Sequence, residues 1–325
     1  MNHIFGPVNS RRLGRSLGVD LFQEKICNLN CIYCEVGATT RLTCERAEYM
    51  PTAGIIAEID AYCSHPEQVA ELDFVTVTAS GEPTLHSGLG EILAHLKRVT
   101  AKPVAVLTNG TTLSDAGVCK ELALADVVIP SLDSALAKSF RKLDRPANCL
   151  DLEKVIEGLV TFSHQYHGKL WLEILFARGI NDSDEDVLAL RRVAGRMRID
   201  RIQLNTVARP PLESFALPLD RQKMLAIAEQ FRHDDPSRPV DLLARGAAQD
   251  DDHDLQKDFD LESDVDRQAL LVEIMEMLKR RPCTAADINR TFHLGGPDKV
   301  EQLLDPLVNA GTLQKRPHGD RLYYQ

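Results

Sequence analysis

The chain has 325 residues, is 44% hydrophobic and 26% charged, and carries a formal net charge of −10. This composition is typical of a globular protein and excludes a disordered chain, and the length suits one large domain and one smaller one. The negative charge argues against a protein that binds nucleic acid over its whole surface, although it leaves room for a local basic patch.

The sequence indicates a protein that works away from membranes. Its first residues lack a charged-then-apolar signal pattern, and there is no apolar run of about 18 residues that could span a bilayer. We therefore expect a cytoplasmic location and no membrane partner. In that compartment the eight cysteines are expected to be reduced thiols or metal ligands and not disulfides.

Between residues 17 and 207, short β-branched apolar runs alternate with amphipathic stretches. This alternation predicts an α/β fold with a parallel sheet covered by helices, and six such units indicate a partial (β/α)6 TIM-like barrel. The predicted strands are 17–21, 73–78, 104–108, 127–131, 170–176 and 202–206. The predicted helices are 53–62, 89–99, 114–124, 152–166, 184–196 and 221–231.

Polar and glycine-rich segments follow the ends of these strands. They include residues 79–84, 109–111, 132–134 and 178–182. In βα barrels the loops at the carboxyl ends of the strands meet at one mouth and build the active site. The sequence therefore predicts that these loops converge on a single site.

The pattern changes after residue 246. Residues 247–263 carry seven acids and one lysine, which predicts a solvated acidic linker; a carboxylate metal site there would lack the ligand spacing of a calcium loop. Residues 264–325 then predict a helix at 266–279, a short helix from Thr284, a helix at 297–310 and a hairpin in 312–324. We expect a barrel domain over 1–246 and a winged-helix-like domain over 264–325.

The charges of the third C-terminal helix argue against a DNA-binding role. It holds Asp298, Glu301 and Asp305 against Lys299, whereas a helix that enters the major groove should neutralise phosphates. We therefore expect the C-terminal domain to dock another protein or to mediate dimerisation.

The strongest motif is a C-x3-C-x2-C segment directly after the first predicted strand. Cys27, Cys31 and Cys34 lie within eight residues, so a short loop can present three sulfurs to one soft metal centre. A [4Fe–4S] cluster held by three cysteines keeps one iron open, whereas a structural zinc ion needs a fourth ligand, for which Cys44 is nearest. The five cysteines outside the motif are scattered singly, and we expect no role for them.

This motif, with an aromatic residue before its last cysteine and a βα barrel around it, resembles the radical S-adenosylmethionine (radical SAM) superfamily. The resemblance covers residues 4 to about 245. It implies that the segment 80–83 contacts the SAM amino group, that polar residues after strand four reach the ribose, and that 179–182 lies beside the adenine. The cofactor-contacting candidates are Tyr33, Gly81, Glu82, Pro83, Asn109, Ser131, Asp133, Glu173 and Asn181.

Phe5-Gly6-Pro7-Val8 and the segment 10–14 resemble a subgroup of iron–sulfur oxidoreductases that is grouped with the wybutosine-synthesis enzyme. That enzyme uses three additional cysteines upstream of the radical motif, and this chain has no cysteine before Cys27. The sequence therefore gives no basis for wybutosine chemistry here.

The resemblance implies an enzyme that takes an electron from a low-potential donor and cleaves SAM to a 5′-deoxyadenosyl radical, which abstracts hydrogen from an unknown substrate. Glu82 is suited to accept a hydrogen bond from the SAM ammonium group, and the backbone at Gly81 allows close approach. Two other functions stay open: a tRNA-modifying radical SAM enzyme, and a zinc-binding winged-helix regulator.

Several charged residues have two interpretations each. Glu173 interrupts an apolar strand, so it either reaches SAM or substrate or pairs with a structural arginine. Tyr33 either lies against the adenine or belongs to the core. The basic cluster of Arg11, Arg12, Arg15 and Lys25 either binds an anionic substrate, neutralises the cluster and SAM, or forms a solvated surface.

Overall fold

The computed structural model describes residues 3–10, 12–243, 264–292 and 294–325. Its centre is one eight-stranded sheet in which β1 is antiparallel to β2 and every other neighbouring pair is parallel. The strand order is β1 (Ile4–Ser10), β2 (Gly14–Asp20), β5 (Phe74–Thr78), β6 (Val104–Thr108), β7 (Val127–Pro130), β8 (Lys169–Phe176), β9 (Arg201–Thr206) and β10 (Val240–Leu242). Because β1 and β10 are its two ends, the sheet is a partial barrel.

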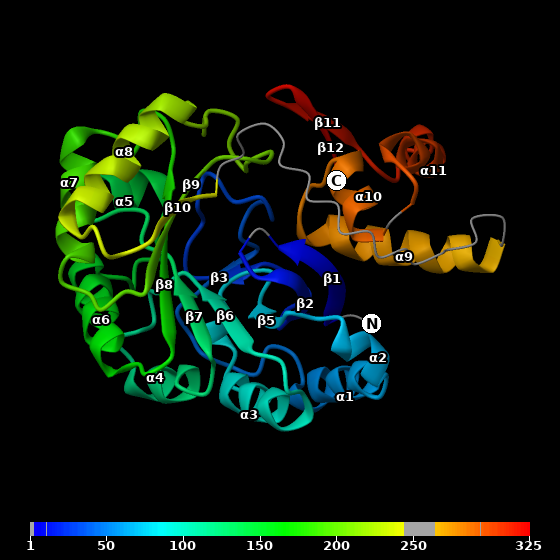
Figure 1. Ribbon diagram of the computed structural model, residues 1–325, viewed down its shortest axis with the longest axis horizontal. Helices are drawn as coiled ribbons and strands as arrows, with labels where there is room; N and C mark the ends of the chain where they lie inside the picture. The colour runs from blue at the N-terminus through cyan, green and yellow to red at the C-terminus, as the bar shows by residue number, and fades with distance from the viewer. Residues whose placement is uncertain (1–2, 11, 244–263, 293) are drawn as a thin grey trace.

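Helices cover the outer side of this sheet, as Figure 1 shows along the left and lower edges of the molecule. They are α1 (Thr52–Cys63), the short α2 (Pro66–Ala70), α3 (Leu89–Val99), α4 (Ala116–Leu122), α5 (Ala137–Leu143), α6 (Leu152–Gln165), α7 (Asp184–Ala194) and α8 (Arg221–Asp234). None of the helices in the described part of the chain has the length and apolar character needed to cross a bilayer.

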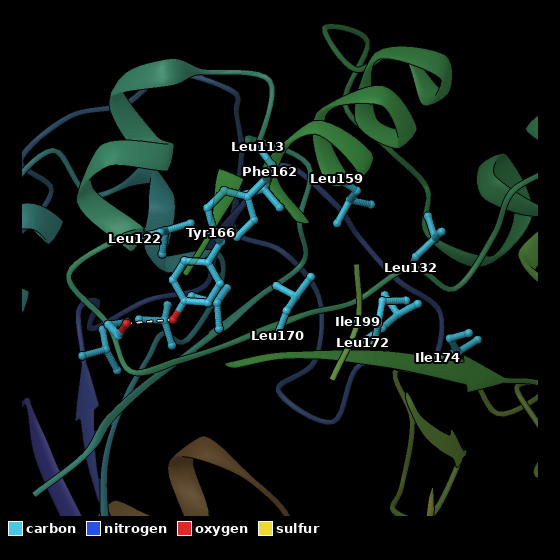
Figure 2. Close-up of a cluster of buried hydrophobic side chains, with 14 of the residues drawn as sticks. Leu113, Leu122, Leu132, Leu159, Phe162, Tyr166, Leu170, Leu172, Ile174 and Ile199 are labelled. Carbon is cyan, nitrogen blue, oxygen red and sulfur yellow. Dashed lines mark hydrogen bonds between the residues drawn. The ribbon is translucent and has the colours of Figure 1, made fainter. Parts of the chain in front are cut away.

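Strand β8 shows why the sequence folds in this way. Its residues alternate between buried and partly buried, so that Leu170, Leu172 and Ile174 point to the helices while Glu173 points to the inside of the barrel. In Figure 2 the apolar side of β8 lies beneath Phe162 of α6, and the hydroxyl group of Tyr166 donates a hydrogen bond of 2.7 Å to a backbone carbonyl oxygen. Apolar burial between sheet and helices therefore fixes which side chains face the site.

All six predicted strands of the barrel are confirmed, and so are the six predicted helices, to within a few residues. The strands β1 and β10, the two-residue strands β3 (Ile26–Cys27) and β4 (Arg41–Leu42), and the helices α2 and α5 were not predicted from the sequence. The predicted acidic linker at 247–263 lies outside the described residues.

Residues 264–292 and 294–325, which we call the C-terminal module, contain a helix, a short helix, a helix and a hairpin in the expected order. Its elements are α9 (Asp264–Arg280), α10 (Ala285–Phe292), α11 (Pro297–Asn309), β11 (Lys315–His318) and β12 (Arg321–Tyr324). The three helices and the hairpin enclose an apolar cluster that includes Ile274, Ile288 and Leu304. Its membership in the winged-helix class stays a prediction.

This module docks onto β1, which places it beside the barrel (Figure 1). Val8 of β1 belongs to the apolar cluster of the module. The guanidinium group of Arg280 lies 3.1 Å from the carboxylate of Asp20 and 4.8 Å from the ring centroid of Phe5. The hydroxyl group of Tyr323 donates a hydrogen bond of 2.8 Å to the carbonyl oxygen of Ala208. The C-terminal module therefore has an interface within its own chain.

Candidate active site

The three cysteines of the motif border one cavity of about 200 Å³. Cys27 ends β3 (Ile26–Cys27), which pairs with β4 (Arg41–Leu42), and the following turn carries Cys31 and Cys34. All three are free thiols. Residues from the carboxyl ends of β5, β6 and β7 and from the loops after them line the same cavity, as the barrel geometry predicts, and Glu173 lines it from within β8. The predicted loop 178–182 does not line this cavity.

The loop after β5 is joined to the cysteine loop through its backbone. The amide of Ile26 donates to the carbonyl oxygen of Ser80 at 3.1 Å, and the amide of Glu82 donates to the carbonyl oxygen of Ile26 at 2.9 Å. Between them Gly81 has φ +146°, and a Cβ atom at this position would lie 1.8 Å from the Ile26 carbonyl oxygen. Gly81 therefore permits the close approach of these two loops.

The carboxylate of Glu82 is buried and held by hydrogen bonds. One oxygen, Oε1, accepts from the amide and hydroxyl of Thr84 at 3.0 and 2.6 Å and from the hydroxyl of Thr108 at 2.7 Å. The other, Oε2, accepts from the amide of Asn109 at 2.6 Å. Burial raises the pKa of Glu82, and these hydrogen bonds oppose that rise. The side chain is thus fixed in place at the cavity wall.

Asn109 lies against the first cysteine and is hydrogen-bonded to a second asparagine, Asn28. The side-chain amide of Asn109 donates to Asn28 Oδ1 at 2.8 Å and lies 3.7 Å from the Sγ atom of Cys27. Asn28 in turn donates to the hydroxyl of Thr111 at 2.7 Å. Hydrogen bonds to cysteine sulfur change the reduction potential of an iron–sulfur cluster. This network could therefore adjust the potential of a cluster bound through Cys27.

On the opposite wall the hydroxyl of Tyr33 donates to the carboxylate of Asp133. The amide of Leu175 donates to the same carboxylate at 2.7 Å. Burial raises the pKa of Asp133 to about 7, and the nearby charge of Glu173 adds to the rise. The Sγ atom of Cys31 lies 3.7 Å from a carboxylate oxygen of Asp144, a residue that the sequence analysis missed.

The predicted site residues fall into two groups. Gly81, Glu82, Asn109, Ser131, Asp133, Glu173 and Tyr33 line the cavity together with the three cysteines. Pro83 and Asn181 are not among its lining residues. Pro83 begins the short helix η1 (Pro83–Leu85). Asn181 is buried, and its side chain is hydrogen-bonded to the backbone. Its Oδ1 atom accepts from the amide of Ala177, and its Nδ2 atom donates to the carbonyl oxygens of Asp133 and Leu175.

Glu173 pairs with an arginine, which is one of the two alternatives expected from the sequence. Its carboxylate forms an ion pair with Arg12 and accepts a hydrogen bond of 3.1 Å from Asn205. It still borders the cavity, so the ion pair fixes a charged group at the wall. Of the basic cluster, Lys25 lines the cavity, Arg15 pairs with Glu71 at 2.7 Å, and Arg11 lies outside the described residues.

One sequence expectation is wrong: the chain contains a disulfide, between Cys44 and Cys149. These two residues lie 105 positions apart in the sequence, so spacing gave no sign of the pair. Because the sulfur of Cys44 is already bonded, it does not serve as the fourth ligand of a zinc ion at the motif. The donor set there is three thiols.

This donor set fits an iron–sulfur cluster. Burial raises the pKa of Cys27 to about 12 and raises that of Cys31 well above its ordinary value. Buried thiols of this kind become thiolates when they coordinate a metal, which releases their protons. Within the described residues, no three His, Cys, Asp or Glu side chains are arranged to hold a single metal ion; the three cysteines border a cavity with room for a larger group.

Comparison with known proteins assigns the class. Residues 25–190 match the family model of the radical SAM superfamily, which spans the cysteine motif and the strand-end loops up to α7. The chain belongs to the radical SAM superfamily.

Among individual proteins, a UPF0026 protein of Synechocystis is 35% identical over 212 residues, which are 65% of this chain and 77% of that protein. A GTPase Obg of Brachyspira hyodysenteriae is 30% identical over 312 residues, which are 96% of this chain and 43% of that protein. This chain therefore spans less than half the length of the GTPase Obg that it matches.

Solved structures share the fold. TYW1 with a bound lysine–pyruvate adduct superposes with a TM-score of 0.51 at 18% identity, over 67% of this chain and 73% of that one. A radical SAM methyltransferase from Sphaerobacter thermophilus gives a TM-score of 0.54 at 15% identity, over 70% of this chain and 66% of that one. At these identities the likeness is one of fold alone.

Proposed function

We propose that this protein is a radical SAM enzyme whose Cys27, Cys31 and Cys34 hold a [4Fe–4S] cluster. When bound, the cluster supplies a low-potential electron and an open iron for SAM, whose reductive cleavage gives a 5′-deoxyadenosyl radical that abstracts hydrogen from the substrate. The observation that carries this proposal is the single cavity that the three cysteines share with the strand-end residues.

The residues around the cavity have separate proposed roles toward SAM. The fixed carboxylate of Glu82 accepts a hydrogen bond from the SAM ammonium group. Ser131 and Asp133 face the ribose, and Tyr33, oriented by its hydrogen bond to Asp133, lies against the adenine. Asn109 supports the cluster through the sulfur of Cys27.

Other predicted residues act by shaping the wall. Gly81 and Pro83 form the turn that carries Glu82, Glu173 is a charged group at the cavity wall, and Asn181 braces the loop after β8 beside the adenine. We further propose a cytoplasmic enzyme that takes its electron from a low-potential donor protein.

The cysteine assignment is tested by anaerobic purification, iron and sulfide analysis, and assay of 5′-deoxyadenosine after reduction. We expect Cys31→Ala to lose the brown colour and to lower 5′-deoxyadenosine formation by more than roughly 100-fold, the upper end of the losses that outer-shell changes cause at metal sites. The matched control is Cys63→Ser, since Cys63 is a free cysteine at the end of α1 and outside the cavity.

The control is expected to keep both colour and activity. If Cys31→Ala still cleaves SAM, the assignment of the cluster to these cysteines is wrong. A colourless wild-type protein with one zinc ion per chain would instead support a zinc-binding regulator.

A further inference from the structure

A second cavity, of about 230 Å³, lies between the β1–β2 hairpin, the strand ends and the C-terminal module. It adjoins the cysteine cavity, because Val36, Thr78, Ala79 and Leu107 line both. A radical formed in the first cavity can react only with a group held next to it. The second cavity is therefore in the right place for substrate.

Arginine side chains dominate the charge of this second cavity, which we call the arginine cavity. Five arginines line it against three carboxylates, which are Asp20, Glu35 and Asp287. The arginines come from four parts of the chain: the β1–β2 turn, the segment after β9, the end of α9 with the residue after it, and α10. They are Arg12, Arg209, Arg280, Arg281 and Arg290.

Three of these arginines are held by close carboxylates. Arg12 pairs with Glu173, Arg209 lies 2.7 Å from Glu35, and Arg280 lies 3.1 Å from Asp20. These pairs fix the wall of the cavity and leave those guanidinium groups largely neutralised.

Two arginines of the C-terminal module differ from the others. Arg290 lies 3.8 Å from the nearest oxygen of Asp287, a loose pair, and its side chain is 44% exposed. Arg281 forms no ion pair or side-chain hydrogen bond with any described residue, and its Nε atom is buried without a partner. A buried guanidinium donor left unpaired is costly, so its presence at a cavity wall points to a bound anion.

We propose that the arginine cavity binds the phosphate group of a small phosphorylated substrate, with Arg281 and Arg290 as its principal donors. A phosphate monoester carries nearly two negative charges at pH 7, which matches two guanidinium groups that are not closely paired, and the arginine fork suits phosphate oxygens. The inference rests on the proposed function, because it places the rest of the substrate toward the cysteine cavity.

The surroundings favour a small molecule over a nucleic acid. A cavity of about 230 Å³ encloses a phosphate and a modest attached group, not a polymer. The nearby α11 carries Asp298, Glu301 and Asp305, which would repel a nucleic acid backbone.

The experiment is a calorimetric titration of the 325-residue chain, without cluster or SAM, with inorganic phosphate and with pyrophosphate. We expect saturable binding that weakens roughly ten- to hundredfold in Arg281→Gln, the usual effect of losing a hydrogen bond from a charged group. Arg290→Gln is expected to weaken binding as well. Arg281→Lys keeps the positive charge but loses the planar guanidinium group that can donate two hydrogen bonds to one phosphate. Its phosphate affinity is therefore expected to lie between those of Arg281→Gln and the wild type.

Lys279→Gln is the matched control. It removes one positive charge two residues from Arg281, but Lys279 does not line the cavity, and its side chain is 64% exposed and pairs with Glu276. We expect its phosphate affinity to equal that of the wild type. Melting temperatures of all variants, measured in parallel, show whether a loss of binding comes from loss of folding.

Absence of phosphate binding, or equal affinity in folded Arg281→Gln and the wild type, overturns the proposal. So does a result in which Arg281→Gln weakens binding of a tRNA pool but not of phosphate. Because the titration needs neither cluster nor SAM, its failure leaves the cysteine test intact, and failure of the cysteine test leaves the titration intact.

Discussion

At Gly81 the loop after β5 approaches the cysteine loop so closely that only a hydrogen atom fits. A Cβ atom there would lie 1.8 Å from the carbonyl oxygen and 2.6 Å from the carbonyl carbon of Ile26. Both obstructing atoms are backbone, so no side-chain rotation can relieve the clash. This contact holds the turn that carries Glu82 against the strand that carries Cys27.

We therefore expect Gly81→Ala to lower the free energy of unfolding by at least about 2 kcal/mol and to lower the iron content after reconstitution. Urea denaturation and iron analysis measure the two effects. The matched control is Gly179→Ala, because Gly179 also has a positive φ, +72°, but has no atom within 4 Å of an added Cβ. Equal losses in the two variants would show that backbone conformation, and not the contact with Ile26, sets the cost.

The cysteines of the motif could be predicted from the sequence, whereas several side chains that support them could not. The spacing of Cys27, Cys31 and Cys34 is local and therefore visible in the sequence. Asp144 lies against Cys31 across 113 positions. Asn28 stands inside the motif, but its side-chain partners Asn109 and Thr111 are 81 and 83 positions away, so no fixed spacing marks these contacts. The disulfide of Cys44 could not be predicted for the same reason, since its partner Cys149 lies 105 positions away.

Strand β8 shows what an alternating sequence pattern can and cannot predict about a side chain. In a strand, alternation puts Glu173 on the opposite side from Leu172 and Ile174, and the burial pattern of β8 agrees with this. Alternation did not identify the partner, because Arg12 comes from a turn 161 residues away. The side chain of Arg12 is 20% exposed and that of Glu173 is 14% exposed, so the ion pair is largely removed from solvent.

A double-mutant cycle on this pair tests its contribution. We expect Arg12→Gln to lower the free energy of unfolding by about 1–3 kcal/mol, since it leaves the carboxylate of Glu173 without its counter-charge in a partly buried place. The double variant Arg12→Gln with Glu173→Gln should be more stable than the Arg12→Gln single variant, because no unpaired charge is left. Urea denaturation of the four proteins gives the coupling energy, and additive effects would show that the pair contributes little.

The strands and helices could be predicted from the sequence where burial dictates the pattern, and two strands could not be predicted at the ends of the sheet, where burial dictates it less. The central strands β6 and β7 are buried almost throughout and consist largely of β-branched and other apolar residues. In contrast, β1 contains Gly6-Pro7 and bulges against β2, and β10 has three residues. Both lie at the ends of the sheet, where each has one neighbouring strand, β2 for β1 and β9 for β10. Pairing with that neighbour, more than local propensity, makes them strands.

For the whole molecule, the C-terminal module is connected to the candidate active site by a continuous line of polar contacts. Arg280 of α9 reaches the carboxylate of Asp20, whose oxygens accept from the amide and the hydroxyl of Ser80 at 2.8 and 2.7 Å. Ser80 directly precedes Gly81 and Glu82 in the loop that borders the cysteine cavity. Docking of the module and placement of this loop therefore depend on the same buried carboxylate.

We expect Arg280→Ala to destabilise this junction, because the side chain of Asp20 is 2% exposed and would lose the guanidinium group that it pairs with. The expected loss is about 2–3 kcal/mol in the free energy of unfolding, moderated by the hydrogen bonds from Ser80 that remain. It should be accompanied by faster amide hydrogen exchange in β1, where Phe5 loses its contact with the guanidinium group, and in the loop at 79–82. Lys279→Ala, next to it on α9, should change neither quantity. Exchange that quickens in the module alone would show that docking and the active-site loop are independent.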